Sequence, residues 1–366
     1  MSNDDGILWT LRPTRLITIR DIAKATGLST ATVSMVLNKA GRRIPPVTHR
    51  LVEDAARRLG YSPNLQARSL RSKRTHSVGV LVFDITDPYC GLIVRGIENS
   101  LETSGHMSVI SDLQNTPRRL HQCLQTLVGR RVDGIIAIAN PVLLGADLSK
   151  AILPFQVPTV LIGSEPENGC YGSVIVNNAR GTWTAFEHLY GFGHREIAVI
   201  KGPKAMTDSA PRWAGIKDCA RAKGIRIDRS LVVEIHGDNS SYEEGYALTE
   251  RLLAGTKPFT ALLAFDDLTA FAAIGALSNV GRRIPEDCSV IGFDDIPGAA
   301  FYNPPLTTLR QHLEEQGSIG AEMMATLLKA GAGGQHEAIH KKIEPQLVVR
   351  KSTATVSRLM KRPFRK

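Results

Sequence analysis

The sequence lacks the features of a membrane protein or of a disulfide-bonded protein. All its apolar runs are far shorter than the roughly 18 residues that a membrane span requires. Residues 1–16 include Asp4 and Asp5 and no apolar run, so they are not typical of a secretory signal, and we expect a cytoplasmic protein. The five cysteines form no C-x-x-C pair; they are Cys90, Cys123, Cys170, Cys219 and Cys288. This argues against a disulfide framework and against a zinc ribbon.

The sequence also lacks the motifs of common enzyme classes. It contains no G-x-x-x-x-G-K-[ST], no G-x-G-x-x-G after a strand and no G-x-S-x-G. Gly191-Phe192-Gly193 is better explained as a helix C-cap. The string from His336 to His340 matches the zinc motif H-E-x-x-H, but glycines at 331–334 precede it and a strand-like segment, 341–350, follows, so the required helix is not predicted. We therefore predict no enzyme activity, no cofactor and no metal site.

The positive charge is concentrated at the two ends of the chain. At 366 residues the chain should form two or three domains, since one hydrophobic core rarely grows past about 250 to 300 residues. Of the net charge of +10, residues 1–76 carry +9 and residues 350–366 carry +7, while residues 77–349 carry −6. We interpret the basic tail as solvated surface. A localised excess can hold a polyanion, so the head is the candidate nucleic-acid-binding region.

The basic head contains the pattern of a helix, a glycine turn and a second helix. Thr18 and Asp21 predict a capping box, and Gly27 ends the first helix. Ser29 is a good N-cap for a second helix, Thr30 to Asn38, whose inner face is Val33, Val36 and Leu37. The outer face is small or uncharged: Thr30, Ala31, Ser34, Met35 and Asn38. This pattern is typical of a helix-turn-helix that lies in the major groove of DNA.

Two further segments complete the head. A third amphipathic helix is predicted from about Val47 to Leu59, with five residues facing inward: Leu51, Val52, Ala55, Ala56 and Leu59. Residues 61–74 then predict one or two helical turns that begin at Pro63 and include four cations. Such a short helix is marginal alone.

From Ser77 onward, short apolar runs alternate with helical patterns. The runs are 78–83, 109–113, 134–139, 158–162, 197–200, 260–265 and 290–293. Buried on both faces, they predict parallel sheets with crossover helices in two doubly wound lobes. Ligands of such folds bind at the carboxyl ends of the strands. The residues there are Asp84, Tyr89, Gly163, Ser164, Asp266, Asp267, Asp294 and Asp295.

The paired aspartates at these strand ends allow two interpretations. Two carboxylates that flank a bond are typical of glycosidases. Adjacent residues at a strand end point apart, however, so we favour hydroxyl recognition or helix N-capping for Asp266/Asp267 and Asp294/Asp295.

Two groups of motifs, one in the head and one in the body, resemble the LacI/GalR family of bacterial transcriptional repressors. The head contributes Thr18 to Ala23, Gly27 to Ser34 and Tyr61 to Leu70. The body contributes Val78-Gly79-Val80, Gly193-His194-Arg195, Ile291 to Asp295 and Pro305 to Thr308. The resemblance covers residues 17–355. It implies an all-α helix-turn-helix headpiece and an α/β two-lobed, periplasmic-binding-protein-like body with parallel doubly wound sheets.

The resemblance implies roles in DNA binding. Bases would be read by the outer face of the second helix, and phosphates would be contacted by Ser29 and Thr32. Residues 64–71, including Ala67, Arg68, Leu70 and Arg71, would form a hinge helix on the operator, with Leu70 wedged between base pairs. Many relatives have Arg or His where this chain has Met35. Because Met cannot make the bidentate contact of Arg with guanine, we expect an apolar contact with a thymine methyl.

The resemblance also implies a sugar-like effector in a cleft between the lobes. Arg212, Asp266 and Asp294 would bind hydroxyls from one lobe, Tyr89 and Ser164 would line the other, and Gln311 would reach in from a crossover. Asn239 holds a position that is often aromatic in relatives, and Gly163 one that is often acidic. A structural ion pair for Arg212, simple packing for Tyr89, and either ring stacking or core packing for Trp213 remain alternatives.

We therefore predict five segments: a disordered extension at 1–16, the DNA-binding domain at 17–63, the hinge and linker at 64–76, the effector-binding and dimerisation domain at 77–355, and a basic tail at 356–366. The expected protein is a homodimeric repressor, and we favour a sugar-like effector that releases it from the operator. The sequence has no leucine heptad for a tetramer. The alternatives are a sugar-binding receptor or a carbohydrate enzyme that does not bind an operator.

Overall fold

The computed structural model describes residues 17–38, 44–62, 74–139, 151–164, 172–236, 241–330 and 338–356. The chain divides into two compact units, residues 1–73 and 74–366. The predicted boundaries of the headpiece, hinge and body stay predictions. Residues 1–16 and most of the predicted hinge and basic tail lie outside the described residues.

The described residues of the first unit form three helices around a small core. They are α1 (Ile19–Thr26), α2 (Thr30–Leu37) and α3 (Pro46–Leu59), close to the predicted bounds. α1 and α3 end at Gly27 and Gly60, whose φ angles of 70° and 67° favour glycine. The buried core residues come from all three helices: Ile22, Ala23, Val33, Val36, Val52, Ala55 and Ala56.

The prediction that Leu51 faces the core is wrong. The Leu51 side chain is 46% exposed, whereas Val52 is fully buried. Successive residues on a helix lie about 100° apart, so the inner stripe of α3 runs through Val52, Ala55, Ala56 and Leu59 and leaves Leu51 at its edge. Two short partner helices do not cover that edge.

The second unit contains two lobes, each built on a six-stranded sheet. Lobe 1 contains β1 (Ser77–Val82), α5 (Pro88–Thr103), β2 (Met107–Asp112), α6 (Arg119–Gly129), β3 (Gly134–Ile138), β4 (Thr159–Ile162), β5 (Gly172–Val176), α14 (Leu313–Ala330) and β11 (Ile339–Ile343). Lobe 2 contains α9 (Asn178–Gly191), β6 (Ile197–Lys201), α10 (Ser209–Ala222), β7 (Val232–Glu234), α11 (Tyr242–Ala254), β8 (Ala261–Leu263), α12 (Asp267–Asn279), β9 (Ser289–Asp294), α13 (Gly298–Phe301), β10 (Thr307–Arg310) and β12 (Gln346–Val348).

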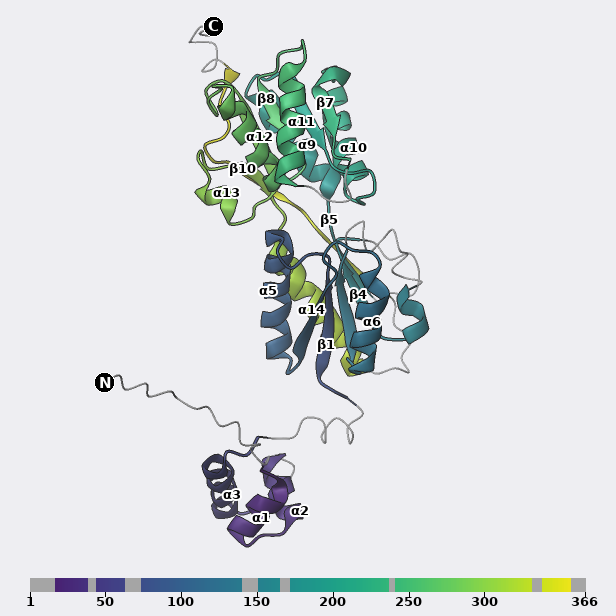
Figure 1. Ribbon diagram of the computed structural model, residues 1–366, viewed down its shortest axis with the longest axis vertical. Coiled ribbons are helices and arrows are strands. Elements are labelled where there is room, and N and C mark those ends of the chain that lie inside the picture. Colours follow the sequence, from purple (N-terminus) through teal and green to yellow (C-terminus); the bar gives the residue numbers. More distant parts are fainter. Residues whose placement is uncertain are drawn as a thin grey trace, which may run out of the picture. The chain divides into compact units, whose positions relative to one another are not determined.

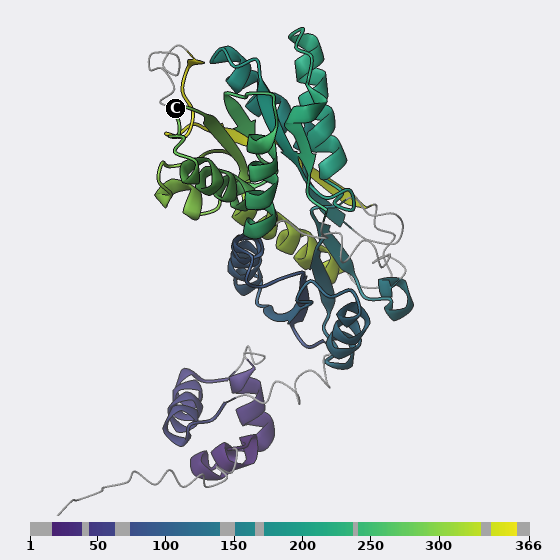
Figure 2. The same ribbon diagram turned by 45° about the horizontal axis from the view of Figure 1, so that its top comes forward.

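Both sheets are dominated by parallel pairs, as the fold class predicted. The strand orders are β11-β5-β4-β3-β1-β2 and β12-β10-β9-β8-β6-β7, and only β10 and β12 pair antiparallel. Helices cover both faces of each sheet (Figures 1 and 2). In β1, Val80 and Val82 pack on the side of α5 and α14, while Leu81 packs on the side of α6. Burial of both faces explains the continuous apolar runs.

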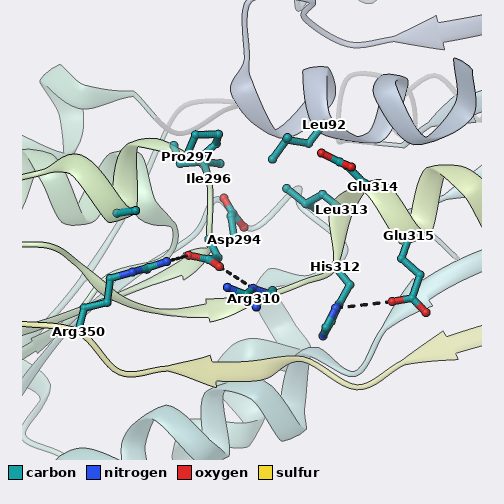
Figure 3. Close-up of a pocket in the computed structure, with 12 residues that line it drawn as sticks. Leu92, Asp294, Ile296, Pro297, Arg310, His312, Leu313, Glu314, Glu315 and Arg350 are labelled. Atoms are coloured by element: carbon teal, nitrogen blue, oxygen red, sulfur yellow. Dashed lines mark hydrogen bonds and ion pairs between the residues drawn. The ribbon is translucent and has the colours of Figure 1, made fainter. Parts of the chain in front are cut away.

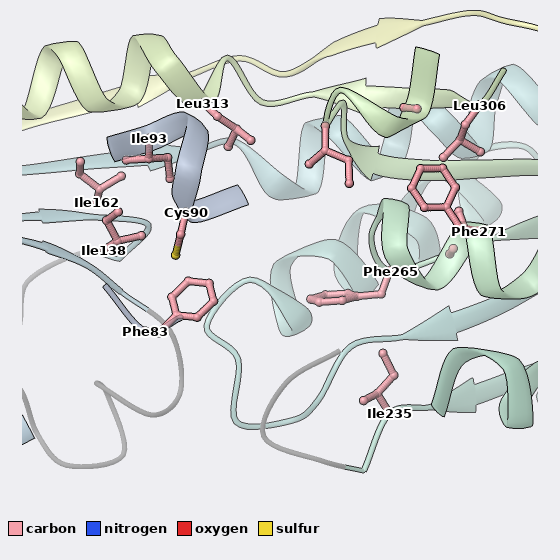
Figure 4. Packing of buried hydrophobic residues seen from close by; sticks show 14 of the residues in the cluster. Phe83, Cys90, Ile93, Ile138, Ile162, Ile235, Phe265, Phe271, Leu306 and Leu313 are labelled. Atoms are coloured by element: carbon pink, nitrogen blue, oxygen red, sulfur yellow. The ribbon is translucent and has the colours of Figure 1, made fainter. Parts of the chain in front are cut away.

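The chain passes between the lobes at three places. It crosses after β5, after β10 and after β11, so α14 returns to lobe 1 and packs against α5 (Figure 1). The two helices approach backbone to backbone, because a Cβ at Gly96 would overlap the Glu314 carbonyl and one at Gly317 would overlap the Ile93 carbonyl. Buried side chains of both lobes belong to one large cluster, which includes Phe83, Leu313 and Phe265 (Figure 4).

Each of the seven predicted apolar runs overlaps a strand. The runs omitted β5, β7 and β10, and the strand-like segment at 341–350 contains all of β12 but only part of β11. The predicted C-cap at residues 191–193 is confirmed, since α9 ends at Gly191 and Gly193 has a φ of 90°. No helix in the described part of the chain is long and apolar enough to span a lipid bilayer.

Candidate functional site

The first candidate site is the outer face of α2. The turn before α2 is fixed by Ser29, whose hydroxyl oxygen accepts a hydrogen bond from the Thr32 backbone N–H at 3.1 Å. At the start of α1, the Asp21 carboxylate accepts a hydrogen bond from the Thr18 backbone N–H at 2.8 Å, so the predicted capping box is present. Both caps fix the beginnings of the two helices.

The predicted base-reading residues share one accessible face of α2. Thr30, Ala31, Met35 and Asn38 are exposed, and Ser34 is partly exposed. Met35 is 43% exposed, so its apolar side chain is accessible on this face. The Asn38 amide donates to the Ser34 carbonyl at 2.8 Å. Asn38 caps the helix, one position past its end, instead of extending it as predicted. Ala67, Arg68, Leu70 and Arg71 lie outside the described residues.

The second candidate site is where strand ends of the two lobes meet. From lobe 1, Tyr89 follows Asp87, the N-cap of α5, whose carboxylate accepts from the Tyr89 N–H at 2.9 Å. A Cβ at Gly163, after β4, would lie 3.8 Å from the Tyr89 hydroxyl oxygen. Gly163 has a φ of 92°, so an acidic residue here would be strained. Ser164 is buried beside it.

Arg212, in the first turns of α10, is the buried cation of lobe 2. Its guanidinium pairs with Asp208 at 2.7 Å and donates to the Asn178 side-chain oxygen at 2.9 Å and the Phe265 carbonyl at 2.6 Å. Its central carbon lies 3.7 Å from the centre of the Phe293 ring. The predicted alternative of a structural ion pair is therefore realised, and it leaves part of the five-donor guanidinium for another acceptor.

Asp266 and Asp267 have different surroundings although they are adjacent. Asp266 is the N-cap of α12 and accepts from the Thr269 N–H at 2.7 Å, so the favoured capping interpretation is confirmed for it. Asp267 points into the protein, where it accepts from the Ile296 N–H at 2.9 Å and from the Thr308 hydroxyl at 2.5 Å. Burial raises the pKa of Asp267 to about 8. The two carboxyls do not form a catalytic pair facing one bond.

Asp294 and Asp295 also point apart. Asp294, at the end of β9, accepts from the Gln311 side-chain amide. Burial raises the pKa of Asp294 well above its usual range, although Arg212 acts against this. Asp295 instead accepts from Arg310 at 2.7 Å and from Arg350 at 2.5 Å. Asp294 is thus the member of the pair that interacts with the cleft groups.

Charged and polar groups of the two lobes are close enough to influence one another. Burial raises the pKa of Tyr89 well above its usual range, and Asp294 and Asp208 of lobe 2 raise it further. Burial raises the pKa of Asp87 to about 6, and Asp266 of lobe 2 contributes to the rise. Such carboxyls are stabilised in their ionised form by added hydrogen-bond donors, which a ligand rich in hydroxyls supplies.

Sequence reasoning missed the groups that hold Arg212. Asp208, Asn178 and the two phenylalanine rings come from separate elements, and no local pattern connects them. The i, i+4 spacing of Asp208 and Arg212 was the one available signal. Asn239, predicted to line the same cleft, lies outside the described residues.

A separate cavity of about 450 Å³ lies beside the crossover after β10 (Figure 3). Of the predicted effector residues only Asp294 lines it, together with Arg310, Arg350 and His312. The two arginines are occupied by Asp295, and Glu314 and Glu315 add negative charge. This cavity is therefore not the place where the predicted effector residues gather.

The zinc-motif string does not form a helix where it is described. His340 is on β11, and its Nδ1 lies 2.8 Å from the Ser173 hydroxyl oxygen. His336 and Glu337 lie outside the described residues. Within the described ranges, no group of three histidine, cysteine or acidic side chains is arranged to hold a metal ion.

Comparison with family models identifies both units. Residues 18–64 match the model described as bacterial regulatory proteins, lacI family. Residues 186–353 match the model described as periplasmic binding protein-like domain.

Two relatives are similar over almost their whole length. The HTH-type transcriptional repressor PurR of Histophilus somni is 31% identical over 343 residues, which are 93% of this chain and 100% of the relative. The HTH-type transcriptional regulator DegA of Bacillus subtilis is 32% identical over 342 residues, 93% and 99% of the two chains. Both are named as regulators, not as enzymes.

Solved structures show the same architecture. The lac repressor dimer bound to operator and the anti-inducer ONPF is 26% identical, with a TM-score of 0.79 over 93% of this chain and 100% of that chain. The complex of the transcriptional regulator CelR with cellobiose is 28% identical, with a TM-score of 0.68 over 92% and 99%. The similarity therefore extends over the helix-turn-helix unit and both lobes.

Proposed function

The chain belongs to the lacI family of bacterial regulatory proteins and is a DNA-binding transcriptional regulator, and we propose that it is a repressor whose operator affinity changes when a small sugar-like molecule binds between its lobes. The observation that carries this proposal is the pairing of an uncharged, accessible helix face in the first unit with buried charged and polar side chains from both lobes of the second, among them Tyr89, Arg212 and Asp294. Operator binding distinguishes this function from that of a sugar receptor or an enzyme.

We assign base reading to the outer face of α2 and phosphate contacts to Ser29 and Thr32. The exposure of Thr30, Ala31 and Met35 supports the first assignment, because short and apolar side chains can approach base edges in the major groove. Before the Asn38 amide can reach an adenine edge, it has to leave the Ser34 carbonyl. Hinge contacts through Ala67, Arg68, Leu70 and Arg71 complete the proposal.

Met35 provides the sharpest test of this interface. Selection of half-sites from random DNA should give a preferred sequence, and Met35→Arg should change it at the position that faces residue 35, towards guanine. A good bidentate contact discriminates by about 1–3 kcal/mol, or roughly 5- to 150-fold. Arg50→Gln, an exposed α3 change, is the control and should leave the preferred sequence unaltered. An identical preference in the Met35 variant would contradict the assignment.

We assign effector binding to Tyr89, Ser164, Asn239, Arg212, Asp266, Asp294 and Gln311. Arg212 and Asp294 would bind neighbouring hydroxyls, since a guanidinium and a carboxylate form strong charge-assisted hydrogen bonds. Tyr89 would close the site from lobe 1. Among related solved structures, one regulator is in complex with cellobiose and another has bound ribose, which supports a sugar-like ligand.

The effector acts in this proposal by favouring one of two arrangements of the lobes. The three crossovers after β5, β10 and β11 are the connections across which the lobes shift. We propose that sugar binding releases the operator, and reciprocity then requires operator DNA to weaken sugar binding by the same factor. A thermal-shift screen of sugars and sugar phosphates, followed by gel shifts with any hit, tests this. An Asp294→Asn variant should lose the response to the hit while keeping operator binding.

We further propose a homodimer, because two half-sites require two headpieces. An exposed aromatic patch on lobe 2 supports it. Phe301 on α13 is 85% exposed and Tyr242 on α11 is 43% exposed, next to a stacked pair, Phe271 and Tyr302, whose ring centres are 4.4 Å apart. Homodimers commonly bury such apolar patches in their interface. Sedimentation should give a dimer for the native chain and a weaker one for Phe301→Ser.

A further inference from the structure

A second pocket lies on lobe 2, and none of the predicted effector residues lines it. It is a groove of about 540 Å³ that is lined by residues of α10, of β7 and of neighbouring segments. Figure 1 labels both elements, and β7 is the edge strand of its sheet. This volume is within the range of about 300–1,000 Å³ that small-molecule sites occupy. The residues that line it are Lys201, Trp213, Lys217, Ile227, Arg229, Val232, Val233 and Glu234.

Trp213 forms an apolar wall of this groove. Part of its side chain packs on the core of lobe 2, and the remainder is accessible. The ammonium of Lys201 lies 5.4 Å from the centre of the indole ring, and that of Lys217 lies 5.9 Å from it. The groove therefore offers a flat aromatic surface with cations at its margin. Ring stacking and core packing both remain alternatives for Trp213, because its packing on the core leaves part of the ring accessible for stacking.

The cations of the groove differ in their partners. Lys201 is paired with Glu234 at 2.5 Å, and the same carboxylate lies 3.9 Å from Lys204. Among the described residues, no carboxylate is within ion-pair distance of the Lys217 ammonium or of the Arg229 guanidinium. Lys217 comes from α10 and Arg229 from the short 3-10 helix Arg229–Leu231 before β7. Two unpaired cations from different elements thus border one aromatic wall.

We propose that this groove binds a small anionic molecule with a planar ring, which would be a second effector of the regulator. The ring stacks on Trp213, and the phosphate or carboxylate of the molecule is held by Lys217 and Arg229. Arginine binds such groups through two parallel N–H donors, and lysine adds a point charge. Arg212, one residue before Trp213, points about 100° away on the helix and serves the cleft, so the two sites are chemically distinct.

Tryptophan fluorescence of the full chain tests the proposal. The probes are adenosine 5′-monophosphate and benzoate, with adenosine and benzamide as their uncharged counterparts. We expect the anions to change the emission saturably and the uncharged probes to bind at least tenfold more weakly. The sequence contains three tryptophans, and Trp213→Phe should abolish the change while Trp9 and Trp183 keep emitting.

A double variant, Lys217→Gln with Arg229→Gln, separates binding from folding. Both side chains are exposed, so the fold should be retained, as circular dichroism would verify, while the apparent Kd for the anions rises at least tenfold. Arg221→Gln is the matched control, because Arg221 is an exposed cation of α10 outside the groove. Absence of a saturable change with both anions, a change that persists in Trp213→Phe, or unaltered affinity in the double variant would each overturn the proposal. None of these results depends on operator binding.

Discussion

The buried carboxyl of Asp267 makes a prediction about how stability depends on pH. Its side chain is fully buried and accepts hydrogen bonds from the Ile296 N–H and the Thr308 hydroxyl. We expect Asp267→Asn to preserve both contacts, with the amide oxygen facing Ile296 and the amide nitrogen donating to Thr308. The variant cannot ionise, so it isolates the effect of the carboxyl charge.

The magnitude follows from the raised pKa. Burial raises the pKa of Asp267 from 3.8 to about 8 in the folded protein. A carboxyl raised in this way stabilises the fold fully below its unfolded pKa, and the contribution is lost as pH rises through the folded pKa. Between pH 5 and 7 the folded state holds a proton that the unfolded state has released. The free energy of unfolding of the native chain should therefore fall by about 1 kcal/mol per pH unit relative to the variant.

Urea unfolding at pH 5, 6, 7 and 8, followed by circular dichroism, measures this difference. At each step to higher pH, the free energy of unfolding of Asp267→Asn should rise relative to that of the native chain. Asp218→Asn, which alters an exposed carboxyl on α10, should run parallel to the native chain. If the Asp267→Asn curve is also parallel, or falls more steeply with pH, Asp267 is ionised in the folded state and the reasoning is refuted.

Two further pairs of variants test packing. Gly96→Ala should lower the melting temperature, because the added Cβ meets the Glu314 carbonyl and overpacking costs about 1–3 kcal/mol. The Cβ of Gly91→Ala, on the same helix, meets no atom within 4 Å, so this variant should leave the melting temperature unchanged or raise it. In the headpiece, Val52→Ala should cost about 1–3 kcal/mol of unfolding free energy, and Leu51→Ala less than about 1 kcal/mol, as chemical denaturation would show. Equal losses within either pair would contradict the packing described above.

Elements with a strong local pattern could be predicted from the sequence. The runs around β1, β3 and β9 are apolar on both faces because helices cover both sides of the sheets. Such strands can therefore be recognised in the sequence without knowledge of the strands that pair with them. β10 is threonine-rich, and β11 is exposed at four of its five positions and carries two lysines, so neither resembles a buried strand. These strands depend on pairing with distant segments, which a local pattern does not record.

The cleft was predictable at its strand ends but not in its internal connections. Strand topology placed Asp266 and Asp294 at carboxyl ends of strands, and the family resemblance implied that they belong to one site. Both side chains are buried, but Asp266 caps α12 whereas Asp267 is held by the Ile296 N–H and the Thr308 hydroxyl, which come from other elements. The same limit applies to Arg212, whose partners come from α9, α10 and the end of β8.

In the proposed mechanism, the Asp294–Asp295 turn would connect ligand binding to lobe movement. Both residues have positive φ angles, 120° and 59°, which non-glycine residues adopt at a cost and retain only where their surroundings fix them. Asp295 is fixed by Arg310 at the end of β10 and by Arg350, which follows β12, and Asp294 is fixed by Gln311 at the start of the crossover after β10. A ligand that draws Asp294 away from Gln311 must therefore alter the crossover, because the neighbouring Asp295 cannot move independently of its two arginines.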